Sequence, residues 1–419
     1  MQLKIMLVYC GGKMNIHRIN KNALILIIAI LLFLFSTVVE DYIHIFSYYD
    51  EVIAIMGLGA LFLKQRYNKD ELKLLFAGMM LVIITLLSNF IFKYQKISVA
   101  FLDLFLNIKF WLTLLLGGMS SRYFRLEWHR KLVSSLVKII VISFVVLFVL
   151  DNLFGLFTPI MRDGLRSTHL FYWQPTYLVA YCVWMIMILI SLDNKKDTLK
   201  YMVLLLFLMC TTYRSKAIAA VVLFVAIYYL AFIRKKKVTT KTFLIFLPAV
   251  ILIGWEQIYW YFFSPIRLDS ARNVLTIVAF KIAREKFPFG SGFGTFASRL
   301  SGINYSPLYD LYGISSVNGL NRADYGYISD SFWPMIIGQC GFIGLALFII
   351  MLSILYKKIC SLHSYNKDYY IACLMGFSYL LIASMAESSF VHPIMMPIAW
   401  WIGLLIGEMN YKKRKVDIR

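Results

Sequence analysis

Long apolar runs separated by short polar stretches cover almost the whole chain. Most of these runs contain about 17–25 residues, the length that an α-helix needs to cross a lipid bilayer. Twelve runs can be placed: 22–39, 49–63, 72–92, 97–118, 135–157, 172–191, 199–213, 216–233, 242–258, 332–356, 370–387 and 394–410. The pattern predicts an all-α polytopic membrane protein with about twelve transmembrane helices, in which residues 1–419 form a single integral membrane domain.

Composition supports this class and excludes a water-soluble globular protein. Hydrophobic residues make up 60% of the 419 residues, charged residues make up 16%, and the mean hydropathy is +0.72. A soluble domain carries about 25% charged residues, so this chain lacks the polar side chains needed to cover a surface that faces water.

The formal net charge of +21 follows a membrane topology and does not indicate a nucleic-acid partner. Lysine and arginine concentrate in alternate connections, such as "KQRYNKDELK", "RKKKVTTK" and the tail "YKKRKVDIR". Because cytoplasmic loops carry such an excess, these connections and both termini are expected in the cytoplasm. The opposite set contains a loop with arginines at 159–171 and a large extracytoplasmic loop at 259–331.

Arginines recur in these outer segments, where positive charge is disfavoured. The candidates for an anion-binding set are Arg162, Arg166, Arg214, Arg272 and Arg284. An arginine at the centre of a membrane helix costs about 2.5–3.5 kcal/mol on insertion scales, so such residues usually have an anionic partner. For each arginine alone, a neighbouring acid such as Asp163 or Glu285 is an equally good partner. For the whole set, convergence on one anion explains more, and the planar guanidinium suits a diphosphate.

One pair of opposite charges lies inside a predicted span. Asp103 and Lys109 in "FLDLFLNIKFWL" are expected to form an intramembrane ion pair, unless the lysine extends to the membrane surface. In either arrangement the two residues are structural and are not assigned to the site.

The glycine-rich stretch "PFGSGFGTF" (288–296) follows a predicted helix that Ser270 caps and that covers 271–286. This helix has apolar positions at helical spacing and basic last turns, so it is expected to lie along the outer membrane surface. The spacing of Gly290, Gly292 and Gly294 is not that of a dinucleotide-binding loop, and no strand is predicted before it. We interpret the stretch mainly as a sharp turn, with contact to a phosphate as the second interpretation.

The polar segment that follows is rich in residue types that bind sugars through ring stacking and hydroxyl contacts. The candidate glycan-binding residues are Tyr305, Tyr309, Tyr325 and Trp333. Asp330 lies where the segment re-enters the membrane, which makes it a candidate general base. The alternative is that Asp330 or Ser331 caps the next helix, with Pro334 in its first turn. His169 and His392 are the other candidate bases.

Four stretches carry a resemblance to a known family: "MRDGLRSTHLFYWQP", "TTYRSKA", "FPFGSGFGTF" and "DSFWPMIIGQCGFIGLALF". In this order, over about residues 160–350, they resemble the Wzy-type O-antigen and capsular polysaccharide polymerases of the O-antigen ligase/polymerase superfamily. The resemblance implies a GT-C-like glycosyltransferase in the bacterial inner membrane, with its active site on the periplasmic face. The implied reaction is an inverting, metal-independent transfer of the growing glycan from undecaprenyl diphosphate onto the non-reducing end of a lipid-linked repeat unit.

The outer arginines and the resemblance together give a mechanism and a set of partners. The donor diphosphate would be held by Arg162, Arg166, Arg214 and Arg272. Asp330, or one of the two candidate histidines, would accept the proton of the acceptor hydroxyl. The carrier lipid arrives with the substrate, so no cofactor is expected. Besides the lipid-linked donor and acceptor, the expected partners are membrane lipid, a chain-length regulator and a flippase.

Two other functions remain as alternatives. Ligases of the superfamily carry a His–Asn type pair where the late outer loop re-enters the membrane, whereas this chain has Asp330 and Ser331, which favours a polymerase. A flippase or transporter would show internal repeats and charges along a central path. No convincing internal repeat is present in the sequence, and the charges gather in the outer segments instead.

Overall fold

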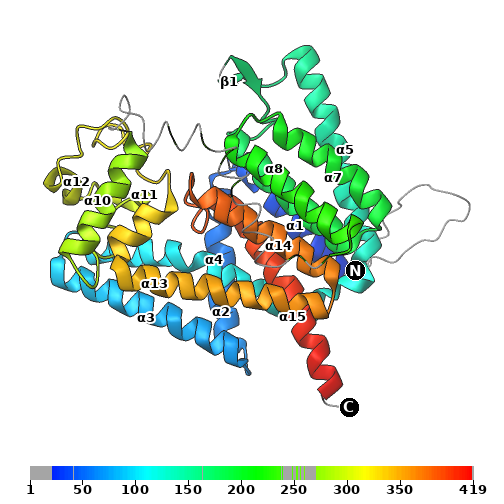
Figure 1. Ribbon diagram of the computed structural model, residues 1–419, viewed down its shortest axis with the longest axis horizontal. Coiled ribbons are helices and arrows are strands. Elements are labelled where there is room, and N and C mark those ends of the chain that lie inside the picture. Colours follow the sequence, from blue (N-terminus) through cyan, green and yellow to red (C-terminus); the bar gives the residue numbers. More distant parts are fainter. Residues whose placement is uncertain are drawn as a thin grey trace, which may run out of the picture.

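The structure, a computed structural model (Figure 1), describes residues 21–40, 42–162, 164–236 and 270–417, with the isolated positions 238, 248, 252, 255 and 259. Most of the predicted span 242–258 lies outside the described residues. Asp163 and the first part of the predicted outer loop 259–331 lie outside them too.

The described chain is mostly helical, as the hydrophobic pattern predicts. The long helices are α1 (Lys21–Val39), α2 (Tyr49–Leu63), α3 (Lys69–Phe92), α4 (Ile97–Phe124), α5 (Leu126–Phe154), α6 (Pro175–Leu192), α7 (Lys195–Cys210), α8 (Ser215–Tyr228), α10 (Ala271–Glu285), α13 (Phe332–Ser361), α14 (Lys367–Ser384) and α15 (Met396–Asp417). Short helical turns are η1 (His44–Tyr48), η2 (Tyr229–Ile233), η5 (Leu362–Ser364) and η6 (Pro393–Met395). Every predicted span inside the described ranges coincides with one of these helices.

Eight helical stretches among the described residues are long and apolar enough to cross a membrane. They are α1, α2 with η1, α3, α4, α5, α6, α8 with η2, and α13 with η5. The chain is therefore a helical protein of the membrane-embedded type. Because α7, α14 and α15 are not among these eight, the total of about twelve spans stays a prediction.

A short β-hairpin is the exception to the all-helical prediction. β1 (Ile160–Arg162) pairs antiparallel with β2 (Leu165–Ser167) inside the predicted outer loop 159–171. Gly164, before the second strand, has a φ of 79°, a conformation that glycine adopts without steric cost. The hairpin places one end of the loop next to the start of α8, as described below for the site.

The central helices approach each other at the level of their backbones. A Cβ atom added to Gly403 of α15 would lie 2.0 Å from the carbonyl oxygen of Leu114 in α4. Small residues at such positions let transmembrane helices pack closely. α2 approaches α4 in the same way at Gly57, and almost all of α6 is buried among other helices. This close packing fixes α2, α4 and α15 relative to one another.

The predicted helix 271–286 is present as α10, which packs along α13. The predicted apolar face is correct, since it is buried at Leu275, Val278 and Ile282. Ser270 is the residue before the first turn, as predicted, but its side chain makes no capping hydrogen bond with this helix. Its position along a membrane surface stays a prediction.

The rest of the described outer loop is compact. Two short helices, α11 (Arg299–Ile303) and α12 (Pro307–Leu311), follow the glycine-rich stretch. At the start of α11, the Ser298 hydroxyl accepts a hydrogen bond from the Ser301 amide at 3.2 Å, which satisfies one backbone donor of the helix. Figure 1 shows α10, α11 and α12 gathered at one end of α3 and α13.

A break in α13 receives the glycine-rich stretch. Gly341 has a φ of 67° and a ψ of −169°, so it divides α13 into a short arm, 332–340, and a long arm, 342–361. A Cβ atom added to Gly341 would lie 2.6 Å from the amide nitrogen of Gly290. A Cβ atom added to Gly290 would lie 2.4 Å from the amide nitrogen of Gly341. Only two glycines can make this backbone contact, since any side chain would push the segments apart.

The backbone of the glycine-rich stretch is hydrogen-bonded to α13. The amide of Ser291 donates to the carbonyl oxygen of Gly338, and the amide of Gly292 donates to the carbonyl oxygen of Gln339, both at 2.9 Å. The break in the helix frees these carbonyl groups from their usual intrahelical donors. The stretch therefore satisfies backbone groups that the break would otherwise leave unpaired.

The same stretch is hydrogen-bonded to α3 and α4 on its other side. The Asn89 side chain accepts from the Phe293 amide at 2.7 Å and donates to the Phe293 carbonyl at 2.9 Å. The Asp103 carboxylate accepts from the Gly294 amide at 2.8 Å. These contacts support the turn interpretation. They leave the phosphate interpretation without support, because the amides at 291–294 already donate to protein oxygens.

Gly341→Ala is expected to destabilise the protein by roughly 2–4 kcal/mol, because the residue would be strained at its positive φ and its Cβ would meet the backbone of Gly290. The matched control is Gly59→Ala in α2, where an added Cβ atom meets nothing within 4 Å. Thermal unfolding of the purified variants in detergent measures the difference. An unchanged unfolding temperature for Gly341→Ala would contradict this account of the break.

Candidate functional site

Cationic side chains from three separate segments lie within electrostatic reach of one another. They come from the hairpin (Arg162), the start of α8 (Arg214 and Lys216) and the start of α10 (Arg272), and they include two ion pairs, with Asp330 and with Glu387. We call these six residues the cation cluster. Arg272 Nη2 lies 3.2 Å from Asp330 Oδ2, and Lys216 forms an ion pair with Glu387.

Backbone and side-chain hydrogen bonds hold the hairpin segment against α8. The amide of Thr168 donates to the carbonyl oxygen of Thr211 at 3.0 Å. The hydroxyl of Ser167 donates to the carbonyl oxygen of Thr212 at 2.7 Å. These bonds fix the end of β2 against the turn that carries Arg214, and Arg162 lies on the paired strand β1. The short loop between α7 and α8 therefore also anchors the segment that follows the hairpin.

A second set of hydrogen bonds holds the start of α13 against the end of α14. Trp333 Nε1 donates to the Ser384 hydroxyl at 3.0 Å, and the Ser388 hydroxyl donates to the carbonyl oxygen of Ser329 at 2.7 Å. Asp330 directly follows Ser329 in the chain, and Glu387 directly precedes Ser388. The two carboxylates are thereby fixed close to the same cations.

The cation cluster is largely shielded from solvent and brings several cationic side chains together. The exposed fractions of the side chains are 10% for Lys216, 14% for Glu387, 20% for Arg272 and 36% for Asp330. Arg162, Arg214 and Arg272 all act electrostatically on Lys216, although the four side chains have the same sign of charge. Poor solvation strengthens the attraction of such a group for an anion. The site is therefore suited to a ligand with more than one negative charge.

Asp330 is the most exposed acid of the cation cluster. Burial raises the pKa of its carboxyl group above the usual range, although Arg272, Lys216 and Arg214 oppose the rise. The predicted capping alternative has no support, since Ser331 is the residue before α13 and its side chain makes no capping hydrogen bond. Asp330 instead faces Arg272 at the open side of the cluster.

The two candidate histidines occupy different environments. Both ring nitrogens of His169 face backbone carbonyl groups, Nδ1 that of Tyr172 at 2.7 Å and Nε2 that of Thr158 at 2.8 Å. This arrangement anchors the loop and leaves no ring nitrogen for a substrate. His392 Nδ1 accepts a hydrogen bond from the Ile394 amide at 3.4 Å. Burial, with Lys109 and Lys216 nearby, lowers the pKa of His392 to about 3, so its ring is neutral at physiological pH.

A buried ion pair lies in the bundle near His392. Lys109 of α4 pairs with Asp50 of α2, and its ammonium group lies 3.9 Å from a carboxylate oxygen of Glu51. The predicted pairing of Lys109 with Asp103 is wrong. Six residues place two side chains about 120° apart around a helix, so they cannot face each other. Each finds its partner elsewhere, Lys109 in α2 and Asp103 in the glycine-rich stretch.

Two of the predicted arginines lie apart from the cation cluster. Arg166 Nη2 lies 2.7 Å from Asp151 Oδ1 at the end of α5 and 3.0 Å from the carbonyl oxygen of Phe157, and it is not among the main charges that act on Lys216 or Asp330. Arg284 is exposed on the last turn of α10, about 18 Å along the helix from Arg272. The contact with Asp151 therefore places Arg166 outside the set, and the distance along α10 places Arg284 outside it.

The predicted glycan-binding aromatic residues have different exposures. Tyr309 is fully buried, and its hydroxyl accepts a hydrogen bond from the Ala297 amide, so it is part of the core of the outer loop. Tyr305 is half-buried and donates to a backbone carbonyl, and Trp333 is half-buried and held by Ser384. Tyr325 is exposed and remains available to a ligand.

Sequence reasoning missed Lys216 and Glu387 as members of the site. A signal for Lys216 was present, because it follows Arg214 by two residues in a hairpin with few other polar side chains. Glu387 stands near His392 in the chain, but its pairing with a residue of α8 could not be read from that position. Within the described ranges, no group of His, Cys, Asp and Glu side chains has the arrangement of a metal site.

Comparison of the chain with protein-family models and with curated proteins finds no match. The site is therefore interpreted from its own geometry.

Glu387→Ala is expected to destabilise the protein by about 3–5 kcal/mol, because Lys216 would be left buried among other cations without its partner. The double variant Glu387→Ala/Lys216→Met is expected to recover most of that loss, since no unpaired charge remains. Thermal unfolding in detergent compares the single and double variants. A double variant as unstable as the single one would show that packing, and not charge, holds this contact.

Proposed function

We propose that the chain is a membrane glycosyltransferase that polymerises glycan repeat units carried on a lipid diphosphate, as in the Wzy-type polymerases that its sequence resembles. The observation that supports this function is the cation cluster, in which shielded cationic side chains from three segments come together. A lipid-linked diphosphate offers several anionic oxygens to such a group of cations. Arginine binds phosphate oxygens through paired hydrogen bonds, which places the diphosphate in one orientation.

The reaction needs a leaving group stabilised by cations and a base for the incoming hydroxyl. The acceptor oxygen attacks the anomeric carbon of the donor sugar, and the bond from that carbon to the phosphate oxygen breaks. The electron pair of this bond leaves with the lipid diphosphate, whose developing charge Arg214, Lys216 and Arg272 would stabilise. Attack from the face opposite the leaving group inverts the anomeric configuration.

Asp330 is the best placed of the candidate bases. Its carboxylate combines partial exposure with direct contact to a cation of the diphosphate set, so an acceptor hydroxyl can reach it while the donor is bound. His169 is occupied by backbone carbonyls on both sides. His392 is buried next to Lys109 and Lys216 and has a low pKa, which makes it a weak proton acceptor.

The set of diphosphate-binding residues differs from the one predicted from sequence. We assign this role to Arg162, Arg214, Lys216 and Arg272. Lys216 joins the set because Arg162, Arg214 and Arg272 all act electrostatically on it. Arg166 and Arg284 leave the set because of their positions. The exposed ring of Tyr325 is the remaining candidate for stacking on a sugar.

Arg214→Ala and Arg272→Ala are each expected to reduce glycan transfer by about 100-fold or more, because each removes a donor that stabilises the leaving group. Cells that carry either variant should accumulate single repeat units and lose long chains, as seen in the gel profile of the surface glycan. The matched control is Arg284→Ala, which removes the same charge from the far end of α10 and should leave the ladder of chains unchanged.

Long chains from both alanine variants, at normal protein levels, would contradict the assignment of the cluster. Deletion of the protein distinguishes a polymerase from a ligase. Loss of a ligase would leave long chains attached to the carrier lipid, whereas loss of a polymerase leaves one repeat unit.

The pH dependence of transfer separates the two remaining bases. A base works in its deprotonated form, so the rate falls as the pH drops through its pKa. Because the pKa of Asp330 is raised, the acid limb should have its midpoint above about 4, the usual value for aspartate. Asp330→Asn should abolish transfer, and His392→Gln should keep the wild-type acid limb. An acid limb near 3 that disappears in His392→Gln would identify His392 as the base.

A further inference from the structure

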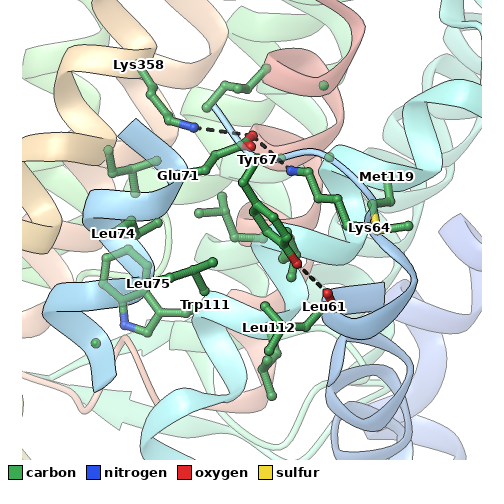
Figure 2. Close-up of a pocket in the computed structure, with 18 of the residues that line it drawn as sticks. Leu61, Lys64, Tyr67, Glu71, Leu74, Leu75, Trp111, Leu112, Met119 and Lys358 are labelled. Atoms are coloured by element: carbon green, nitrogen blue, oxygen red, sulfur yellow. Dashed lines mark hydrogen bonds and ion pairs between the residues drawn. The ribbon is translucent and has the colours of Figure 1, made fainter. Parts of the chain in front are cut away.

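A large cavity in the helical bundle, shown in Figure 2, is lined by no residue of the cation cluster. Its volume is about 700 Å³, and its walls come from α2, α3, α4, α13 and α15. The glycine-rich stretch contacts α3 and α4 at residues 88–103, whereas the cavity uses residues 71–83 and 108–122 of the same two helices. The cavity and the glycine-rich stretch therefore lie at different levels along α3 and α4.

The walls of the cavity are apolar, and its rim is basic. Leucine, valine, isoleucine and methionine side chains form most of the lining, including Leu75, Val82, Leu115 and Ile406. At the rim, Glu71 Oε1 lies 2.9 Å from Lys64 Nζ and 3.4 Å from Lys358 Nζ. Figure 2 shows the two ammonium groups reaching the carboxylate from opposite sides.

The charge at the rim is not balanced. Lys64 and Lys358 share the Glu71 carboxylate, and Asp70 also acts electrostatically on Lys358. Arg122 adds a third cation to the lining, so these cations outnumber the two acids. An apolar cavity beneath a basic rim fits a molecule with a hydrocarbon chain and an anionic head. A free phosphate would gain nothing from the apolar walls. A volume of this size lies in the range of about 300–1,000 Å³ typical of sites for small organic ligands.

We propose that this cavity binds an anionic phospholipid, with an acyl chain among the apolar walls and the phosphate next to Lys64 and Lys358. The loop that contains Lys64 is one of the lysine-rich connections expected in the cytoplasm. Anionic lipids of the cytoplasmic leaflet are attracted to basic residues at this level. The site is independent of the proposed glycan transfer and does not share a residue with the cation cluster.

Lipid retention by the full chain tests the proposal. The protein is purified from nanodiscs that contain equal amounts of phosphatidylglycerol and phosphatidylcholine, and the bound lipid is weighed by native mass spectrometry. The wild type should retain phosphatidylglycerol in preference. Lys64→Gln and Lys358→Gln should each lower this preference about fivefold, the effect of one basic residue near a charged lipid. Lys357→Gln, which removes an exposed charge from the neighbouring position, is the matched control.

A second pair of variants tests the cavity itself. Val82→Trp should fill the space and reduce retention of both lipids, whereas Val146→Trp on an exposed face of α5 should not. Equal retention of the two lipids by the wild type would overturn the proposal, as would an unchanged preference in Lys358→Gln. Preferential retention of an isoprenyl phosphate added in competition would assign the cavity to a carrier lipid instead.

Discussion

The backbone contact between Gly290 and Gly341 is the constraint on which the rest of the outer half depends. It fixes the glycine-rich stretch in the break of α13, and the stretch in turn joins α10 to that helix. Arg272 stands on α10 and Asp330 precedes the short arm of α13. Their ion pair can therefore form only while the two helices keep this arrangement. The glycine-rich stretch, which could have been a phosphate-binding loop, instead connects α10 to α13 and so aligns Arg272 with Asp330.

The second organising factor is the cost of a charge in apolar surroundings. Lys109 and Lys216 are both largely buried, and each has a carboxylate from a different segment as its partner. Such pairs contribute little net stability, but removal of one partner is expensive. The pairs thus favour one arrangement of α2, α4, α8 and the segment after α14 that carries Glu387. The basic rim of the cavity follows the same rule with Glu71 between two lysines.

The helices could be predicted from the sequence because apolar length and periodicity are local properties of the chain. α10 is an example, since its buried face follows from its own spacing. Contacts between distant segments could not be predicted in the same way. Asp103 was paired with the nearest opposite charge, but the side chains point to different faces of α4 and the true partner is the amide of Gly294. The cost of positive charge near the membrane predicts that the outer arginines converge, and Arg166 fits that argument equally well although it pairs with Asp151 outside the cluster.

The short arm of α13 adds an electrical property of its own. No side chain caps its first turn, which begins directly after Asp330 and Ser331. The aligned peptide groups of a helix carry about half a unit of positive charge at this end. Part of the positive potential at the site therefore belongs to the backbone. Unlike a guanidinium or an ammonium group, this contribution cannot be titrated or deleted by a single substitution, and it persists as long as the arm remains helical.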